Sequence, residues 1–153
     1  MRKVDREIKD FNEIIDVINN LETIRIGINN DQYPYVVPVS FGYEVIDQQL
    51  VFYFHGAKAG MKYDLIKKNP HVCVEGDICY RFKDTISSVT CLYESIIAFG
   101  KCELVDDDQE VIKGLKLLLS HCGYDNHFID DKAAKYTALY KVTVTAITGK
   151  RRF

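Results

Sequence analysis

The sequence lacks the features that mark secreted, membrane-spanning and nucleotide-hydrolysing proteins. No apolar run is long enough to cross a bilayer, and the charged start MRKVDREIKD is not followed by the apolar stretch of a signal peptide. The GxxxxGK phosphate loop and the GxGxxG dinucleotide fingerprint are also missing. We therefore expect a cytoplasmic protein with no membrane partner, in which any nucleotide is bound by another motif.

The chain also has little excess charge of either sign. It carries 20 Lys and Arg against 22 Asp and Glu, a formal net charge of −2. Such a balance gives no overall field to attract nucleic acid or an anionic membrane, so any anion site must be a local cluster. With 153 residues, 47% of them hydrophobic, the chain is long enough for one domain over residues 1–153 with a core of its own.

Cysteine pairing motifs are missing, although cysteine itself is not rare. The chain has five cysteines, an odd number with no CxxC pair, at Cys73, Cys79, Cys91, Cys102 and Cys122. We interpret them as reduced and mostly buried thiols, which fits a cytoplasmic location. His121, Cys122 and His127 lie close together in the sequence, but their spacing matches no zinc pattern, and we expect no metal site.

Apolar and β-branched segments between turn residues predict six strands, over residues 23–29, 33–44, 50–55, 71–77, 90–105 and 138–149. Helices are predicted over 10–21, over 61–69, and after Asp107, with Asp10 and Asp107 as N-caps. Residues 80–88 are expected to form a loop. Many strands and few inserted helices favour a mainly β fold, a six-stranded antiparallel barrel with helical decorations.

Some details of these strands carry further expectations. Pro34 and Pro38 remove two ladder donors, which predicts an edge or a bulge, and Gly100 marks a bend. LVFYF (50–54) and SIIAF (95–99) are apolar at nearly every position, whereas a one-sided barrel wall should alternate. Their outer faces are therefore expected to meet another surface, and a second copy of the chain is the simplest one. We expect a homodimer.

The stretch YFHGAKAGMKYDLIKKNP (53–70) predicts a tight turn from a strand into a short helix that begins near Met61. Free backbone N–H groups at a helix N-terminus attract anions, and glycines allow close approach of a ligand. Lys58 and Lys62 add cations where the helix dipole disfavours them, and a bound phosphate would account for their presence. A solvated surface turn with ordinary lysines is the alternative, and composition does not decide between the two.

Four segments, in this order, resemble a known family: YPYVVPVSFGYE (33–44), YFHGAKAGMKYDLIKKNPHVCVE (53–75), YESIIAFGKCELV (93–105) and ITGKRR (147–152). The chain resembles the flavin-binding split-barrel proteins related to pyridoxamine 5′-phosphate oxidase, nearest the 5-nitroimidazole antibiotic resistance (Nim-like) branch. The resemblance implies a split β-barrel that binds FMN at the interface of a homodimer. FAD is the alternative cofactor.

The resemblance also implies a set of flavin-binding residues. These are Pro38, Val39 and Ser40 along the isoalloxazine ring, His55, Gly56, Lys58 and Lys62 at the ribityl phosphate, Tyr93 and Ser95 around the flavin, and Lys150 and Arg151 in the basic tail. Each of these residues has an alternative role that is purely structural, as an ordinary strand serine, a core tyrosine or part of a solvated tail. His55 is also the candidate catalytic residue, because its pKa near neutrality suits proton donation or orientation of an acceptor.

The implied function is that of an FMN-dependent oxidoreductase that reduces a nitroimidazole, another nitroaromatic or a similar small flat acceptor. Two alternatives stay open: a non-catalytic flavin-binding stress protein, and a haem-binding split barrel with His55, His71 or His121 as axial ligand. Oxidation of pyridoxamine phosphate itself is disfavoured, since the chain is short and lacks a fuller basic set for a second phosphate. The electron donor and the physiological acceptor stay open.

Overall fold

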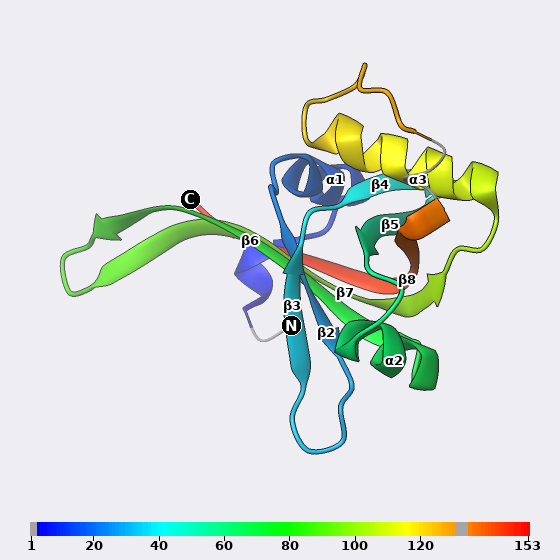
Figure 1. Ribbon diagram of the computed structural model, residues 1–153. Helices are drawn as coiled ribbons and strands as arrows, with labels where there is room; N and C mark the ends of the chain where they lie inside the picture. The colour runs from blue at the N-terminus through cyan, green and yellow to red at the C-terminus, as the bar shows by residue number, and fades with distance from the viewer. Residues whose placement is uncertain (1–2, 131–134) are drawn as a thin grey trace.

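The computed structural model describes residues 3–130 and 135–153, and these residues form an eight-stranded sheet with three α-helices (Figure 1). The helices are α1 (Phe11–Asn19), α2 (Met61–Lys68) and α3 (Asp108–His121), and a 3₁₀ turn spans Val4–Arg6. The strands are β1 (Glu7–Ile8), β2 (Ile24–Ile28), β3 (Tyr35–Val39), β4 (Gly42–Ile46), β5 (Gln49–Gly56), β6 (His71–Asp84), β7 (Val89–Leu104) and β8 (Ala138–Arg152).

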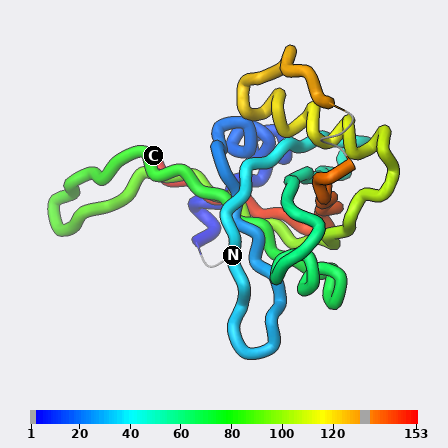
Figure 2. The backbone as a smooth tube through the Cα atoms, in the orientation of Figure 1, coloured from blue at the N-terminus to red at the C-terminus, as the bar shows by residue number. Residues whose placement is uncertain are grey.

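The sheet is antiparallel throughout and runs in the order β3-β2-β6-β7-β8-β5-β4, with β1 paired to the end of β8. Helix α1 packs against β7, α2 against β2 and β7, and α3 against β4 and β5. The hairpin of β6 and β7 projects far beyond the rest of the molecule, and the C-terminal end of β8 reaches its base (Figure 2). We call the projecting part, residues 79–93, the arm.

The structure confirms a mainly β split barrel but corrects the number of strands from six to eight. The segment predicted as one strand, 33–44, divides into β3 and β4, because Phe41 turns inward and is fully buried in the core. The two-residue strand β1 was also missed. Among the described residues, no helix combines the length and the apolar character needed to span a membrane.

The prediction of a loop over residues 80–88 is wrong. Strand β6 continues to Asp84 and β7 begins at Val89, so only four residues connect them. The polar composition of this segment suggested a loop, but backbone pairing with β7 holds it extended. A register shift between Cys79 and Arg81 marks a β-bulge in the arm.

Several local predictions are confirmed. The side chains of Asp10 and Asp107 accept hydrogen bonds from backbone N–H groups in the first turns of α1 and α3, as expected of N-caps. The ladder of β7 with β8 shifts register at Gly100, where the bend was predicted. Pro38 lies in β3, which has only β2 beside it in the sheet order, so it occupies the predicted edge.

The description of the cysteines as mostly buried is wrong. All five are free, but only Cys102 is buried, while Cys79 and Cys122 are exposed. The prediction rested on the apolar runs around Cys73 and Cys102. Cys79 instead lies in the arm, and Cys122 lies at the end of α3.

The outer face of β5 is covered by the chain itself. Phe52 and Phe54 point into the barrel core, while Val51 and Tyr53 pack with Val111 of α3 in a second apolar cluster. The apolar character of LVFYF therefore has an explanation within one chain, and the expectation that a second copy covers this strand is wrong. The outer face of β7 differs, because Ile97 and Phe99 are exposed there.

Candidate functional site

The turn between β5 and α2 has the geometry of an open helix N-terminus. Gly60 is the N-cap of α2 and has a φ of 105°, a conformation that residues with a Cβ rarely adopt. No side chain caps the helix. Helix N-termini without a cap keep backbone N–H groups available to an anion, as the sequence predicted for this turn.

Lys62, in the first turn of α2, lies across this turn. Its Nζ lies 5.4 Å from the centre of the Phe54 ring and 5.3 Å from that of Tyr140, two rings that stack at 4.8 Å. A Cβ on Gly56 would come within 2.7 Å of the same Nζ, so a larger residue there would displace the ammonium from its present position. Burial lowers the pKa of Lys62. Within residues 3–130 and 135–153, Lys62 forms no ion pair.

His55 lies close to Lys62. It is exposed at the end of β5; neighbouring atoms partly desolvate its ring, and with the charge of Lys62 they lower its pKa below its ordinary value. His55, Gly56 and Lys62 form one group, which we call the turn cluster. Ser40 is exposed between β3 and β4, and none of the described contacts joins it to this cluster.

Two other residues expected near the flavin lie on β3. Pro38 is exposed on the edge strand, while Val39 is half-buried and packs against the core. Lys58, in contrast, turns away from Lys62. Its Nζ donates a hydrogen bond to the backbone oxygen of Lys135, at 2.6 Å, beside a pocket lined by Tyr63, Val105 and other residues.

A second group of predicted residues lies at the base of the arm. Tyr93 and Ser95 follow one another on the same face of β7, and Lys150 pairs with Ser95 on β8. The Nζ of Lys150 lies 5.9 Å from the centre of the Tyr93 ring. We call these three residues the arm cluster.

Arg151 points to the other face of the sheet. Its guanidinium lies 3.5 Å from a carboxylate oxygen of Glu94 and 3.4 Å from one of Glu13 in α1. Glu94 is buried and also accepts a 2.6 Å hydrogen bond from the hydroxyl of Tyr80. This set of contacts ties the C-terminal strand to α1, and we leave Arg151 out of the candidate site.

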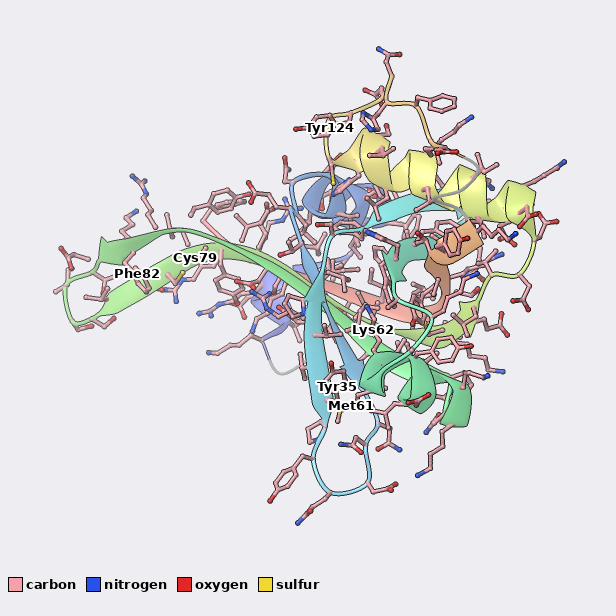
Figure 3. The ribbon with its side chains drawn as sticks, in the orientation of Figure 1. Tyr35, Met61, Lys62, Cys79, Phe82 and Tyr124 are labelled. Carbon is pink, nitrogen blue, oxygen red and sulfur yellow. The ribbon has the colours of Figure 1, made fainter. Side chains whose placement is uncertain are left out.

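The turn cluster and the arm cluster are far apart in one chain. His55 pairs with Leu139 near the start of β8, whereas Ser95 pairs with Lys150 near its end. Eleven residues of strand separate these positions, about 36 Å at ~3.3 Å per residue. Figure 3 shows Lys62 in α2 well apart from Cys79, which pairs with Tyr93 of the arm cluster.

A family model for pyridoxamine 5′-phosphate oxidase matches residues 10–151, nearly the whole chain. The chain belongs to the pyridoxamine 5′-phosphate oxidase family. A search of curated protein sequences returned no match. Membership of this family accounts for the split-barrel fold and leaves the reaction to be argued from the site.

Solved structures of this fold include one relative of moderate identity. A candidate 5-nitroimidazole antibiotic resistance protein from Bacteroides thetaiotaomicron is 29% identical, with a TM-score of 0.84, covering 94% of this chain and 85% of that one. The flavocytochrome Anf3 from Azotobacter vinelandii is 16% identical, with a TM-score of 0.80, covering 100% and 72%. An FAD binding protein from Mycobacterium smegmatis is 20% identical, with a TM-score of 0.62, covering 96% and 98%. The last two show the shared fold alone.

The aromatic pair beneath Lys62 was missed in the sequence. Phe54 and Tyr140 come from apolar strands that read as ordinary core, and 85 residues separate them along the chain, so no local pattern joins them. The alternation of Phe54 with His55 at the end of β5 was the only available signal.

Two histidines that the sequence offered as haem ligands have other contacts. The Nε2 of His121 lies 2.7 Å from the backbone oxygen of Leu21, and its ring packs on Phe41 with 4.1 Å between the centres. The Nδ1 of His71 lies 3.0 Å from the side-chain oxygen of Asn69. In the described part of the chain, no group of three or more His, Cys, Asp or Glu side chains could hold a metal ion.

Proposed function

We propose that this chain binds FMN, with the phosphate at the turn cluster and the isoalloxazine ring along the end of β3. The observation that carries the proposal is the ammonium of Lys62, which lies beside an uncapped helix N-terminus and forms no ion pair with the described residues. A cation is disfavoured there by the helix dipole and by partial burial, and a phosphate would relieve both costs. The family match and the FAD binding named for a neighbour support a flavin as the source of that phosphate.

The residues of the turn cluster fit a phosphate group. Gly56 and Gly60 leave the backbone open to close approach, and Lys62 supplies one positive charge at that opening. Lys58 would have to release the Lys135 carbonyl to add a second charge, so we assign it a smaller part. Val39 ends the strand on which a flat ring could lie, and Ser40 directly follows it.

Bound flavin would supply the two-electron chemistry, with a nitroimidazole or another small flat nitroaromatic as the acceptor. The chain itself supplies orientation and a proton. The exposed ring of His55 lies at the open end of the cluster, where its lowered pKa keeps it neutral and able to orient an acceptor at pH 7. At lower pH the imidazolium donates a proton to an oxygen of the nitro group. The Bacteroides relative, a candidate 5-nitroimidazole resistance protein, supports this choice of acceptor.

We also propose that two chains share each flavin site. The arm cluster lies too far from the turn cluster to reach the same ligand within one chain. Ile97 and Phe99 continue the face of β7 that carries Tyr93 and Ser95, and both are exposed. Beside them lies a hollow of about 590 Å³ lined by Val72, Phe99 and other mostly apolar residues. A second copy seated on this face would bury the apolar residues and bring its turn cluster to the arm cluster.

Cofactor titration tests the phosphate assignment. Lys62→Met keeps the apolar stem on the aromatic pair and removes the charge, so FMN should bind ~10–150-fold more weakly, the loss of one charge-assisted hydrogen bond of ~1.5–3 kcal/mol. Riboflavin, which has no phosphate, should bind equally well to parent and variant. Lys67→Met is the matched control, because Lys67 lies on the same helix with its Nζ 5.1 Å from the centre of the Tyr63 ring. Equal losses for FMN and riboflavin would contradict the assignment.

The absorption spectrum and mass of the bound chromophore test the class of cofactor. Two visible flavin bands and the mass of FMN would support the proposal, and the mass of FAD would change only the nucleotide. A Soret band would favour the haem-binding alternative, for which His55 and His71 are the exposed candidates. If flavin binds and no acceptor is ever reduced, the chain is a flavin-binding protein without turnover of its own.

A further inference from the structure

Two thiols of the arm point at each other. The Sγ atoms of Cys79 on β6 and Cys91 on β7 are 2.9 Å apart. Cys79 is exposed and Cys91 is half-buried, so solvent reaches the pair. Within one chain, the arm carries them away from α2 and Lys62, as the labelled Cys79 shows in Figure 3. None of the residues proposed to contact flavin is a member of this pair.

The β-bulge of the arm produces this arrangement. Cys79 pairs with Tyr93, but after the register shift the residue that pairs with Cys91 is Phe82, three positions beyond Cys79. Tyr80 is the extra residue, and the hydroxyl of its side chain bonds to Glu94 on the opposite face. Cys79 and Cys91 are therefore diagonal neighbours on one face of the hairpin. A bulge increases the local twist of the strand pair, which can draw such diagonal neighbours together.

We propose that Cys79 and Cys91 are a redox pair that closes to a reversible disulfide when the protein meets a hydroperoxide. In the first step the sulfur of one cysteine attacks the peroxide O–O bond, which gives a sulfenic acid and one molecule of water or alcohol. In the second step the other sulfur displaces that hydroxyl as water and forms the S–S bond. Two thiols lose two electrons and two protons in total, and the peroxide takes up both.

The environments of the two thiols indicate which cysteine acts in each step. Cys79 is the exposed member and is the one a peroxide reaches first. The hydrogen bond with Cys79 and the nearby charge of Asp77 raise the pKa of Cys91, so Cys91 keeps its proton and acts second. Closure requires the sulfur atoms to move from 2.9 Å to about 2.05 Å apart. The bond would cross-link β6 and β7 near the base of the arm.

Peptide mapping without reduction tests the pairing. Trypsin cuts after Lys68, Arg81, Lys83 and Lys101, so Cys79 and Cys91 fall in separate peptides, 69–81 and 84–101. Cys73 shares the first peptide, and the experiment therefore uses Cys73→Ser protein as its parent. After treatment with hydrogen peroxide, we expect the two peptides to appear as one species, lighter by two hydrogen atoms than their sum. Dithiothreitol should separate them again.

Single variants test the order of the steps. In Cys91→Ser, Cys79 should accumulate as a sulfenic acid that a dione probe traps, while Cys79→Ser should show much less trapping at Cys91. Cys122→Ser is the matched control, because Cys122 is exposed but belongs to no such pair, and it should leave the disulfide unchanged. The proposal is overturned if Cys79 is driven to sulfinic acid while Cys91 stays a thiol. It is also overturned if Cys122 oxidises as fast as the pair, or if the new bond joins two chains.

Discussion

Strands β5 and β7 have the same apolar sequence pattern, but their outer faces differ in what covers them. Both are apolar at successive positions, in LVFYF and SIIAF, so both predict that each of their faces is covered. Helix α3 covers β5, with Val111 packed on Val51 and Tyr53. The outer face of β7 is not covered by the described residues of its own chain at Ile97 and Phe99. The pattern therefore indicates that a face is covered and leaves open what covers it.

The two regions of the candidate site differ in the same respect. The region of β5 is complete within one chain, and at its end the turn cluster presents a cation to solvent. The region of β7 presents an aromatic ring, a hydroxyl group and an ammonium group beside an open apolar face. A second copy of the chain on the open face of β7 would join the two regions in one site. Substitutions in each region test this arrangement.

The largest effect is expected where α3 covers the β4–β5 hairpin. A Cβ on Gly42 would collide with the backbone of Leu117 and Leu118 in α3, which cannot yield as a side chain can. Gly42→Ala should therefore lower the free energy of unfolding by ~3 kcal/mol, the upper part of the range for overpacking. Urea unfolding measures it.

Gly27→Ala is the control for this change. Gly27 also lies in a strand, but a Cβ there would meet Cys73 at an ordinary 3.6 Å. We expect this variant to be as stable as the parent or slightly more stable, since alanine lowers the entropy of the unfolded chain. If both variants unfolded at the same urea concentration, α3 would not be packed on β4 as described.

The sequence predicted a structural feature correctly where that feature depends on the chemistry of one or a few neighbouring residues. N-caps at Asp10 and Asp107, the bend at Gly100 and the edge position of Pro38 follow from the chemistry of single residues, and the structure confirms them. The prediction of a loop over 80–88 failed because backbone pairing with the adjacent strand β7, and not the propensity of these residues, decided their conformation. Similarly, Gly114 of α3 faces Tyr53 and Leu139, a contact that the sequence does not indicate, because a glycine carries no hydrophobic signal.

The site was predictable only in part for the same reason. A resemblance named the residues, and the structure brings His55, Gly56 and Lys62 together. It also shows what no sequence pattern could, that Lys58 bonds to Lys135 and that Arg151 faces Glu13. Contacts of this kind depend on strand register across the whole sheet.

The next effect concerns turnover at the end of β5. His55→Gln should retain FMN but reoxidise chemically reduced flavin with a nitroimidazole ~100-fold more slowly at low pH, the usual scale of general acid help. Because the folded protein lowers the pKa of His55 below its ordinary value of 6.5, the parent should gain rate only as pH falls below that value. The variant should show no such gain. Anaerobic stopped-flow from pH 5 to 8 measures both, and parallel pH profiles would make His55 purely structural.

A smaller effect is expected at the open face of β7. Phe99 is 56% exposed, and a charge placed there would be buried if a second copy covers this face. Phe99→Asp should raise the Kd of the dimer ~30-fold, about 2 kcal/mol, as for a moderate hot spot. Sedimentation across a dilution series measures it, with Phe128→Asp as the control, since Phe128 is exposed in the loop after α3. A parent that stays monomeric at all concentrations would end the proposal of a shared site.

The smallest expected effect tests most directly whether the regions of β5 and β7 form one flavin site. Tyr93→Ala should weaken FMN binding about 5-fold, the worth of one aromatic contact of ~1 kcal/mol. Lys62→Met weakens it from the other region. When the two variants are unfolded, mixed and refolded together, each mixed dimer holds one site with both changes and one site with neither. With random pairing, about a quarter of all sites should then bind FMN like the parent. Each variant refolded alone should show no such sites, and a mixture that also shows none would mean that Tyr93 and Lys62 of one site come from the same chain, which contradicts a shared site.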